Sequence, residues 1–536
     1  MHARHAPVVH LVVLVLLLLS TAVHASAQTG QAPPGPSGPV RQLTMDEAVA
    51  LALENNLGVR VARIEPLVQD LGILQARTAW APTISTTVEG TGTDSPNVSV
   101  LSGAEGTTIT DNRLATTVGL QQALPWGARY SVGWDSSRAT TTNLFSNFSP
   151  QLRSSVTFSY RQPLLRDREI DTARWQVATA TRDRSLADLD LRQTVVSTAR
   201  SVRSAYWNLA YAIALLDVQR QSLELAQESL RNTRARIEIG TQPPIDVVEA
   251  EAEVAQREEA LILAEAQIEQ EQDTLRTLVF DPSMPDFWTV RIEPAALPAF
   301  EPAPVDVDGA VRRAIAERTD VRRSQRAIET DEVGLRFFRN QTLPDVSAGV
   351  DFGGTGLGGT QFVRGPGLPG PIIGQTQRSF GSVLGDVFGN AYPTWTASLS
   401  VNYPLGTSQQ EASLARARLQ LTRTRTELQR LELQVTAQVR AAGRQVTTNQ
   451  RRVETTRVAR ELAERRLDAE QRKLAAGTST SFLVFQAQRD LAVARNNELR
   501  AVLDYNQSVV DFEAVQQAPI AGTGTQTATQ TATGAQ

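Results

Sequence analysis

The sequence is poor in the residues on which most enzyme chemistry depends. It has no cysteine, 5% aromatic residues and a single lysine, Lys473. Its four histidines all lie within the first 24 residues, at His2, His5, His10 and His24. Thiol nucleophiles, Ser-His relays and His-based metal sites are therefore excluded from the rest of the chain. No paired-acid or Gly-rich catalytic motif replaces them, so we expect neither an enzyme nor a metal or cofactor site.

The two ends of the chain have the composition of segments that pack no core. Arg4, an apolar run over residues 8–19 and Ala25-Ser26-Ala27 predict a secretory signal peptide over residues 1–27. The apolar run is short for a permanent anchor, which needs about 20 apolar residues. Residues 28–42, rich in Pro and Gly, predict a disordered linker, and residues 517–536 predict a disordered tail.

Two very long helical patterns dominate the chain, and a Gly-Thr pair interrupts each of them once. Before Gly240-Thr241, apolar residues recur at spacings of three and four over about six heptads, which is typical of a coiled-coil seam. A helix of about 70 residues is about 105 Å long and must project from any compact domain. The sequence therefore predicts two helical hairpins, over residues 168–281 and 407–516, with tips at Gly240-Thr241 and Gly477-Thr478.

Between the helical segments the apolar period changes to two, which predicts strands. Four candidate strands lie near residues 83–93, 113–123, 128–136 and 153–162, and two more lie at 344–354 and 393–404. A Gly-rich stretch over residues 353–391 separates the last two strands, and we expect it to be a loop.

The order of short helices, strands and long hairpin occurs twice. Repeat 1 covers residues 43–281, repeat 2 covers residues 306–516, and a Pro-rich linker over 282–305 joins them. Pro163 to Gly240 spans 77 residues and Pro404 to Gly477 spans 73, so the outgoing helices match within about one turn. The strand region of repeat 1 is longer, because it carries an extra pair of strands.

The strands have the length and alternation of an outer-membrane barrel wall, in which about 9–11 tilted residues cross the apolar layer. Four tryptophans lie in or beside them, as in an interfacial girdle: Trp80, Trp126, Trp134 and Trp395. A half-buried sheet of a soluble protein would alternate in the same way. A barrel needs about eight strands and lipid does not tolerate an open edge, so a membrane location requires several chains to share one barrel.

In this order the motifs resemble the TolC-like outer-membrane efflux proteins over residues 43–515. They are Arg161-Gln162-Pro163-Leu164-Leu165 and Asn402-Tyr403-Pro404-Leu405 after the strands, and Ile239-Gly240-Thr241 and Ala476-Gly477-Thr478 at the tips. The resemblance implies a mainly α fold with a membrane β-barrel segment, built as a homotrimer that shares one barrel. It also implies a location in the cell outer membrane, with contact to lipid there and the helical part in the periplasm.

The same resemblance implies a passive exit channel from the periplasm to the exterior. The channel would belong to a tripartite efflux pump or a type I secretion system, and its partners would be a periplasmic adaptor protein and an inner-membrane pump. The adaptor would dock on the hairpin tips, at Gly240, Thr241, Gly477 and Thr478.

The chain departs from this family at the periplasmic gate. Leu483 and Gln486 stand where the family has acidic rings, and Ser479 stands where it has an arginine partner for the aspartate that corresponds to Asp246. We hypothesise that closure sets acidic residues of the first hairpin against an arginine of the second, or uses apolar packing alone. The gate candidates are Asp246, Glu249, Glu253, Gln486 and Arg489. Ordinary solvated helix charges are the alternative for these residues.

Other functions fit parts of the pattern. A periplasmic adaptor protein would also have a coiled-coil hairpin, although the second hairpin and the strands argue against it. A trimeric surface adhesin would place its coiled coil outside the cell. The net charge of −4 gives no reason to expect a nucleic-acid partner. The extra strands of repeat 1 fit either a wider barrel or packing at its rim.

Overall fold

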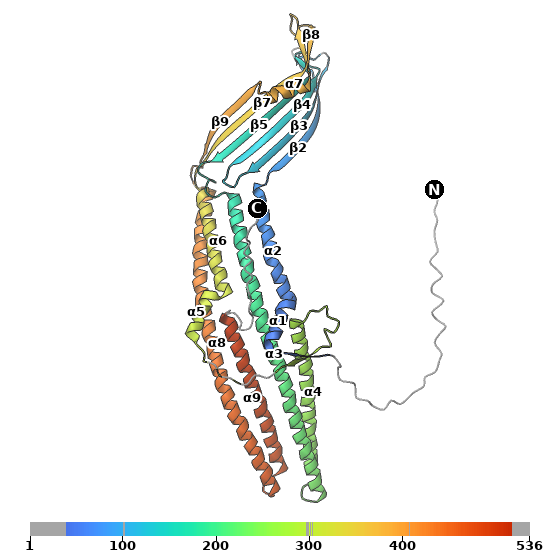
Figure 1. Cartoon of the computed structure of the whole chain (residues 1–536), viewed down its shortest axis with the longest axis vertical. Helices are drawn as coiled ribbons and strands as arrows, with labels where there is room; N and C mark the ends of the chain where they lie inside the picture. The colour runs from blue at the N-terminus through green and yellow to red at the C-terminus, as the bar shows by residue number, and fades with distance from the viewer. Residues whose placement is uncertain are drawn as a thin grey trace, which may run out of the picture.

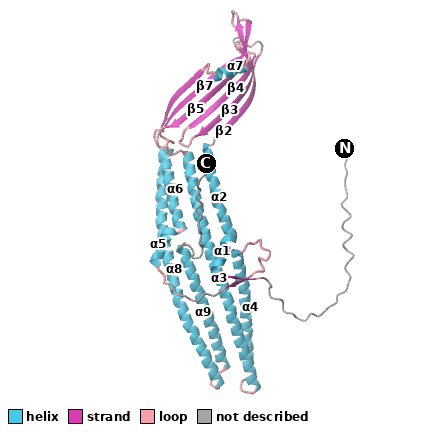
Figure 2. Ribbon diagram, in the orientation of Figure 1, coloured by secondary structure: helices cyan, strands magenta, loops and turns pink. Residues whose placement is uncertain are grey.

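The computed structural model describes residues 39–99, 102–104, 106–295, 300, 302, 304–406 and 408–516. The predicted signal peptide and the predicted C-terminal tail lie outside these residues. The described chain is elongated, with one β-sheet at one end and long helices over the rest of its length (Figure 1). Figure 2 shows the same division by secondary structure.

Both repeats follow the order of short helices, strands and a long helical hairpin. Repeat 1 contains α1 (Met45–Asn55), α2 (Leu57–Arg77), a 3-10 turn (Thr78–Trp80), β2 (Thr83–Pro96), β3 (Thr108–Ala123), β4 (Arg129–Thr141), β5 (Phe148–Pro163), α3 (Thr172–Glu238) and α4 (Ile245–Val279). Repeat 2 contains α5 (Val307–Glu317), α6 (Thr319–Gln341), β7 (Asp345–Arg364), β8 (Ile372–Arg378), α7 (Phe380–Phe388), β9 (Pro393–Asn402), α8 (Gln409–Ala475) and α9 (Ser481–Gln516). The chain therefore has the predicted duplicated, mainly α-helical architecture.

The strands of both repeats form one antiparallel sheet in the order β2-β3-β4-β5-β7-β8, with β9 also paired to β7. The first half of β7 pairs with β9, and its far end pairs with β8. Near the helices the wall is thus six strands wide, from β2 to β9. Strand β2 follows α2, and β5 leads into α3, so β3 and β4 are the extra pair. The structure shows that this pair lies within the wall and not at its rim.

The register gives the sheet one apolar face and one polar face. Val118, Trp134 and Val156 lie side by side on the three neighbouring strands β3, β4 and β5. Phe158 and Phe352 lie opposite each other on β5 and β7. The apolar face comprises Ile84, Val88, Leu114, Val118, Leu120, Tyr130, Val132, Trp134, Val156, Phe158, Tyr160, Val346, Ala348, Val350, Phe352, Trp395, Ala397, Leu399 and Val401. Most positions between them along the strands are Ser or Thr, and the others are Gly, Ala and Asp. This two-sided pattern is that of a barrel wall with lipid outside and water inside.

The helices that carry the sheet form a row in the order α2, α3, α6, α8. Helices α2 and α8 therefore lie at the two flanks of the row, as β2 and β9 lie at the two edges of the wall. The predicted seam of α3 is buried, with Val202 and Leu209 fully covered and Tyr206 3% exposed. Among the described residues, none of the helices is both long and apolar enough to cross a membrane.

The linker predictions are wrong where the structure forms a small second sheet. Strand β1 (Val40–Leu43) pairs in parallel with β6 (Arg291–Pro294). The first three residues of β1 fall in the segment predicted as a linker over 28–42, and β6 lies within the one predicted over 282–305. Leu43 and Ile292 are buried in the core around α3, and Tyr206 Oη donates a hydrogen bond to the Leu43 carbonyl at 3.2 Å. Two four-residue strands so far apart in sequence leave no local periodicity to predict them.

The prediction of a Gly-rich loop over residues 353–391 is also wrong. Strand β7 continues to Arg364, and β8 and helix α7 follow it. Glycine is required here by packing, because a Cβ on Gly356 would lie 2.2 Å from the Val383 carbonyl oxygen of α7. The glycines therefore mark a strand covered closely by a helix.

A buried arginine fastens the β6 segment to the helical hairpin. Arg276, whose side chain is 4% exposed, donates from Nε to the Val290 carbonyl at 2.7 Å and from Nη2 to Gln272 Oε1 at 2.8 Å. Its Nη1 pairs with Asp273. One side chain thus holds both the α4 surface and the strand that follows it.

We expect Arg276→Ala to release the segment around β6, at a cost of about 2 kcal/mol or more, because buried acceptors lose their donor. The measurement is the rate of tryptic cleavage after Arg291 in the folded protein, which should rise. Arg60→Ala is the control, since its pair with Asp281 at 3.4 Å is exposed and is worth less than about 1 kcal/mol. Equal cleavage rates in the two variants would contradict this role for Arg276.

Candidate functional site

The two hairpin tips have the same backbone geometry. Gly240 and Gly477 adopt the left-handed conformation, with φ of 79° and 75°. The amide of Thr241 donates to the Arg236 carbonyl, and the amide of Thr478 donates to the Lys473 carbonyl, each at 2.9 Å. No atom lies within 4 Å of a Cβ built on either glycine, so the backbone conformation and not crowding requires glycine here.

The side chain of the threonine after each glycine adds a second hydrogen bond across the turn. Thr241 Oγ1 donates to the Arg236 carbonyl at 2.9 Å, and Thr478 Oγ1 donates to the Lys473 carbonyl at 3.2 Å. Each hydroxyl thus bonds the same acceptor as its own amide, which satisfies carbonyls that a helix end leaves free. Around these turns apolar side chains stand in solvent: Ile239, Ile245, Val248, Phe482 and Leu483 are 40–74% exposed.

Polar side chains join the two hairpins near their tips. Gln242 Nε2 donates to Ser481 Oγ at 2.6 Å, at the level of the turns. Further along the helices, Gln488 Nε2 donates to Ser229 Oγ at 2.8 Å. The tips of α3–α4 and α8–α9 therefore lie next to each other at the end of the molecule opposite the sheet (Figure 1).

Of the gate candidates, the structure brings Glu253 and Arg489 together. Glu253 is buried on α4, with its side chain 3% exposed, and its Oε2 lies 3.1 Å from Arg489 Nη1 on α9. Arg257, one turn along α4, lies 2.6 Å from the other carboxylate oxygen. A buried carboxylate shared by two arginines links the two hairpins of one chain.

The other gate candidates are not brought to this cluster. In the part of the chain that the structure describes, Asp246, Glu249 and Gln486 make no ion pair or side-chain hydrogen bond. Arg257 is a participant that the sequence reasoning missed, although its position four residues after Glu253 was a usable signal for an ion pair on one helix face.

The charged groups differ between the tips. At the first tip Arg234 pairs with Glu251 across the hairpin at 2.7 Å, whereas at the second tip a glutamate bonds the turn itself. Glu470 accepts hydrogen bonds from Lys473 Nζ and from Ser479 Oγ, both at 2.8 Å. The Lys473 bond, and then the Ser479 bond, lower the pKa of the Glu470 carboxyl below its ordinary value of 4.5. A carboxyl whose pKa is lowered by folding stabilises the fold at pH values above its ordinary pKa. That stabilisation is lost as the pH falls through the lowered pKa, so the cluster is intact at neutral pH.

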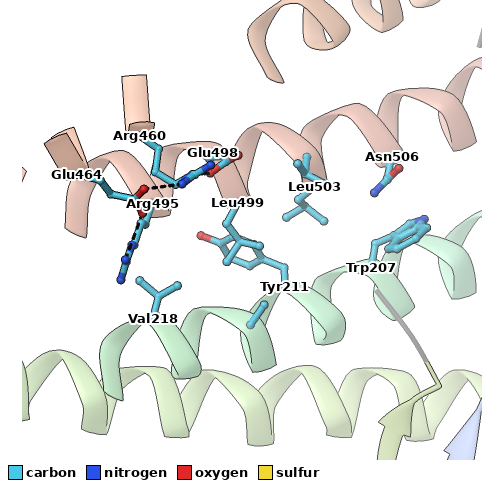
Figure 3. Close-up of a pocket in the computed structure, with 12 residues that line it drawn as sticks. Trp207, Tyr211, Val218, Arg460, Glu464, Arg495, Glu498, Leu499, Leu503 and Asn506 are labelled. Carbon is cyan, nitrogen blue, oxygen red and sulfur yellow. Dashed lines mark hydrogen bonds and ion pairs between the residues drawn. The ribbon is translucent and has the colours of Figure 1, made fainter. Parts of the chain in front are cut away.

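Farther from the tips, a cavity of about 400 Å³ lies between α3, α8 and α9 (Figure 3). Trp207, Tyr211, Leu499 and Leu503 form its apolar wall. Ion pairs close one end: Glu464 lies 2.9 Å from Arg460 and 3.3 Å from Arg495, and Arg460 also pairs with Glu498. Burial acts to raise the pKa of Glu464, but the hydrogen bonds from the two arginines outweigh it and lower that pKa.

These groups offer no reaction centre. The acids of the cavity are neutralised by arginines, and the described residues include no group of three or more His, Cys, Asp or Glu that could hold a metal ion. A sheet with one apolar and one polar face, above long helical hairpins whose tips lie side by side, has the features of a membrane protein.

Comparison with known proteins gives the family. A sequence profile of outer membrane efflux proteins matches residues 48–279 and 310–515, which cover most of both repeats. The chain therefore belongs to the outer membrane efflux protein family and is located in the outer membrane. This confirms the predicted TolC-like identification and fold, and removes the alternative of a periplasmic adaptor.

Individual relatives agree with the family. The chain is 26% identical over 353 residues to the pyoverdine export outer membrane protein OpmQ of Pseudomonas putida, an alignment that spans 63% of this chain and 66% of OpmQ. Its fold is similar to that of the outer-membrane channel OprN, with 16% identity, a TM-score of 0.62, and 88% and 89% of the two chains covered. The CmeC outer membrane channel of Campylobacter jejuni gives 13% identity, a TM-score of 0.61, and 88% and 85% coverage.

We expect Glu253→Gln to loosen the two hairpin tips, because the two arginines lose their shared negative charge. Hydrogen–deuterium exchange of the tip amides should become about tenfold faster, since local opening sets the exchange rate. Glu249→Gln is the matched control on the same helix, and its tips should exchange like those of the unaltered protein. An equal effect of both substitutions would show that net charge, not this ion pair, controls tip stability.

Proposed function

We propose that three copies of this chain form one passive exit channel across the outer membrane. The shared barrel would continue into a periplasmic tunnel made of the long helices, with no enzymatic step. The observation that supports this most directly is the six-stranded wall, which has two open edges and an apolar face with large side chains exposed on β2 and β9. In lipid, unpaired edge amides and carbonyls cost several kcal/mol each, so another chain must cover both edges.

The two edges suit each other. Strand β2 runs away from the helices and β9 runs back toward them, so β2 of one copy lies antiparallel to β9 of the next. The apolar faces of neighbouring copies then join on one side. The family resemblance implies three copies, and six wall strands from each make an 18-stranded barrel with an aqueous interior.

The flanks of the helical row support the same assembly. On α2, six apolar side chains at coiled-coil spacing are more than half exposed: Leu57, Val61, Ile64, Leu67, Leu71 and Leu74. On α8, at the opposite flank, Leu419, Leu433, Val458 and Leu462 are also more than half exposed. A neighbouring copy would bury the α2 stripe against the upper part of α8, at Leu419 and Leu433, because Asp70 of α2 lies at about the height of Thr424 of α8.

The tips supply the contact with the rest of the export machinery. We propose that a periplasmic adaptor docks on Gly240-Thr241 and Gly477-Thr478, where rigid turns present exposed apolar side chains. An inner-membrane pump would then complete a tripartite efflux system, and a type I secretion system fits the same geometry. The relation to OpmQ, a pyoverdine export protein, supports an export role. We further propose that the link between Glu253 and Arg489 holds the periplasmic mouth closed.

The shared barrel can be tested by cross-linking, because the chain has no cysteine of its own. Thr87→Cys on the polar face of β2 is combined with one cysteine on the polar face of β9, at Thr394, Thr396, Ser398 or Ser400. A short bismaleimide should give covalent dimers and trimers in membranes for at least one pair.

Two control pairs make this result specific. Thr87→Cys with Thr117→Cys joins directly opposed positions of β2 and β3 and should link only within one chain. Thr117→Cys with the same β9 positions should give no oligomer, because β3 lies inside the wall. Oligomers through Thr117 would show a different closing edge, and monomers in every case would refute the shared barrel.

The gate can be tested by single-channel conductance in planar bilayers. Glu253→Ala and Arg489→Ala should each raise the conductance severalfold, because each removes the buried link between the hairpins. Asp246→Ala and Glu249→Ala should keep the unaltered value, since neither side chain reaches Arg489. The proposal fails if the second pair opens the channel as much as the first.

A further inference from the structure

Helix α7 lies flat on the sheet at the end farthest from the helical hairpins (Figure 1). Val383 and Val387 face the sheet and are 0% and 6% exposed. Beneath them β7 carries Gly354, Gly356 and Gly358, and a Cβ on any of these would lie within 3 Å of an α7 atom. The helix thus rests on bare strand backbone, which fixes its position closely.

The register shows which face of the sheet α7 covers. The three glycines alternate in phase with Val350 and Phe352, so they lie on the same face as these apolar residues. Phe352 is opposite Trp395 of β9, which belongs to the same face. Helix α7 therefore lies on the apolar side of the wall, whereas Thr355 between the glycines points to the polar side.

The apolar face ends under α7. Gly354 is level with Val156 and Trp134, and Gly358 is level with Leu152, Arg138 and Leu114. At the next level beyond Arg138 the pair is polar, Asn112 opposite Thr140. Trp134 Nε1 also donates a hydrogen bond to Ser154 Oγ at 2.8 Å, at the step between the levels of Gly354 and Gly358. The helix thus straddles the line where lipid-facing residues give way to polar ones.

The outer surface of α7 is aromatic and carries no free charge. Phe380 is 37% exposed and Phe388 is 75% exposed, and Trp395 nearby is 75% exposed. The one ionisable residue of the helix, Asp386, forms an ion pair with Arg378, whose Nη2 lies 2.8 and 3.1 Å from the two carboxylate oxygens. Aromatic side chains prefer the boundary between lipid headgroups and acyl chains.

We propose that α7 is an interfacial helix, which lies in the outer leaflet of the outer membrane and fixes the depth of the barrel there. Phe380 and Phe388 contact lipid, and the glycine strip of β7 keeps the helix against the wall. Lipid is the occupant of this surface because the helix lies on the lipid side of the wall, whereas copies of the chain meet at its edges. The inference rests on the outer-membrane location and the two faces of the sheet, and does not depend on how many copies close the barrel.

The test uses one spin label at Phe388→Cys in the full-length, otherwise cysteine-free protein, reconstituted in liposomes. Oxygen concentrates in the bilayer and a nickel chelate stays in water, so the ratio of their collision rates reports the depth of the label. The ratio at position 388 should exceed severalfold the ratio at Thr355→Cys, a matched label on the opposite face of the wall at the same level. A label at Phe380→Cys should behave like the one at position 388.

Equal or greater nickel access at position 388 than at position 355 would overturn the proposal. Phe388 is 75% exposed, so its substitution removes little packing, and tryptic digestion checks the fold of each variant, including that of Phe380→Cys. The β2–β9 cross-links test the assembly separately. Failure of the lipid contact would leave those cross-links in place, and a barrel closed through other strands would leave the label depth unchanged.

Discussion

A strand in a bilayer cannot leave the amides and carbonyls of its edge without partners, and this constraint organises the whole chain. The wall of this protein has one apolar face and ends at β2 and β9. A single copy therefore cannot reside in lipid, however stable its helices are. The helices repeat the same geometry below, because α2 and α8 lie at the ends of their row and carry exposed apolar stripes. Sheet and helices thus require the same neighbours.

The extra pair of strands changes the relation between barrel and tunnel. In each copy four helices, α2, α3, α6 and α8, stand below six wall strands. Strands β3 and β4 continue into no helix, since a tight turn through Gly127 reverses the chain between them. Because barrel circumference grows with strand number, these strands would widen only the membrane part of the proposed channel. In the proposed assembly, separate parts of the sequence would therefore set the width of the barrel and the width of the helical tunnel.

The spacing of apolar residues predicted the long helices and the strands of the wall. The seam at Val202 and Leu209 and the alternation around Trp134 follow from spacing alone, and the duplication made both more secure. Distant pairings were missed, as with β1 and β6, because four residues carry too little pattern. Gly356 misled for a different reason: glycine reads as a loop former, but here a helix on the strand requires it. Among the gate candidates only Glu253 reaches Arg489. The sequence pattern of one hairpin could not show this, because the distance between side chains on two hairpins depends on how the hairpins pack together.

The two tips show how a duplicated element keeps its backbone and changes its chemistry. Gly240 and Gly477 make the same turn, closed by the same threonine bonds to Arg236 and Lys473. Two residues after the glycine, however, Gln242 bonds the opposite hairpin, whereas Ser479 bonds Glu470 within its own hairpin. The side chain at this position of the first tip therefore bonds the other hairpin, whereas the side chain at this position of the second tip bonds its own hairpin. If an adaptor docks on these tips, it meets two alternating kinds of surface around the ring, with one shared shape and two different sets of polar groups.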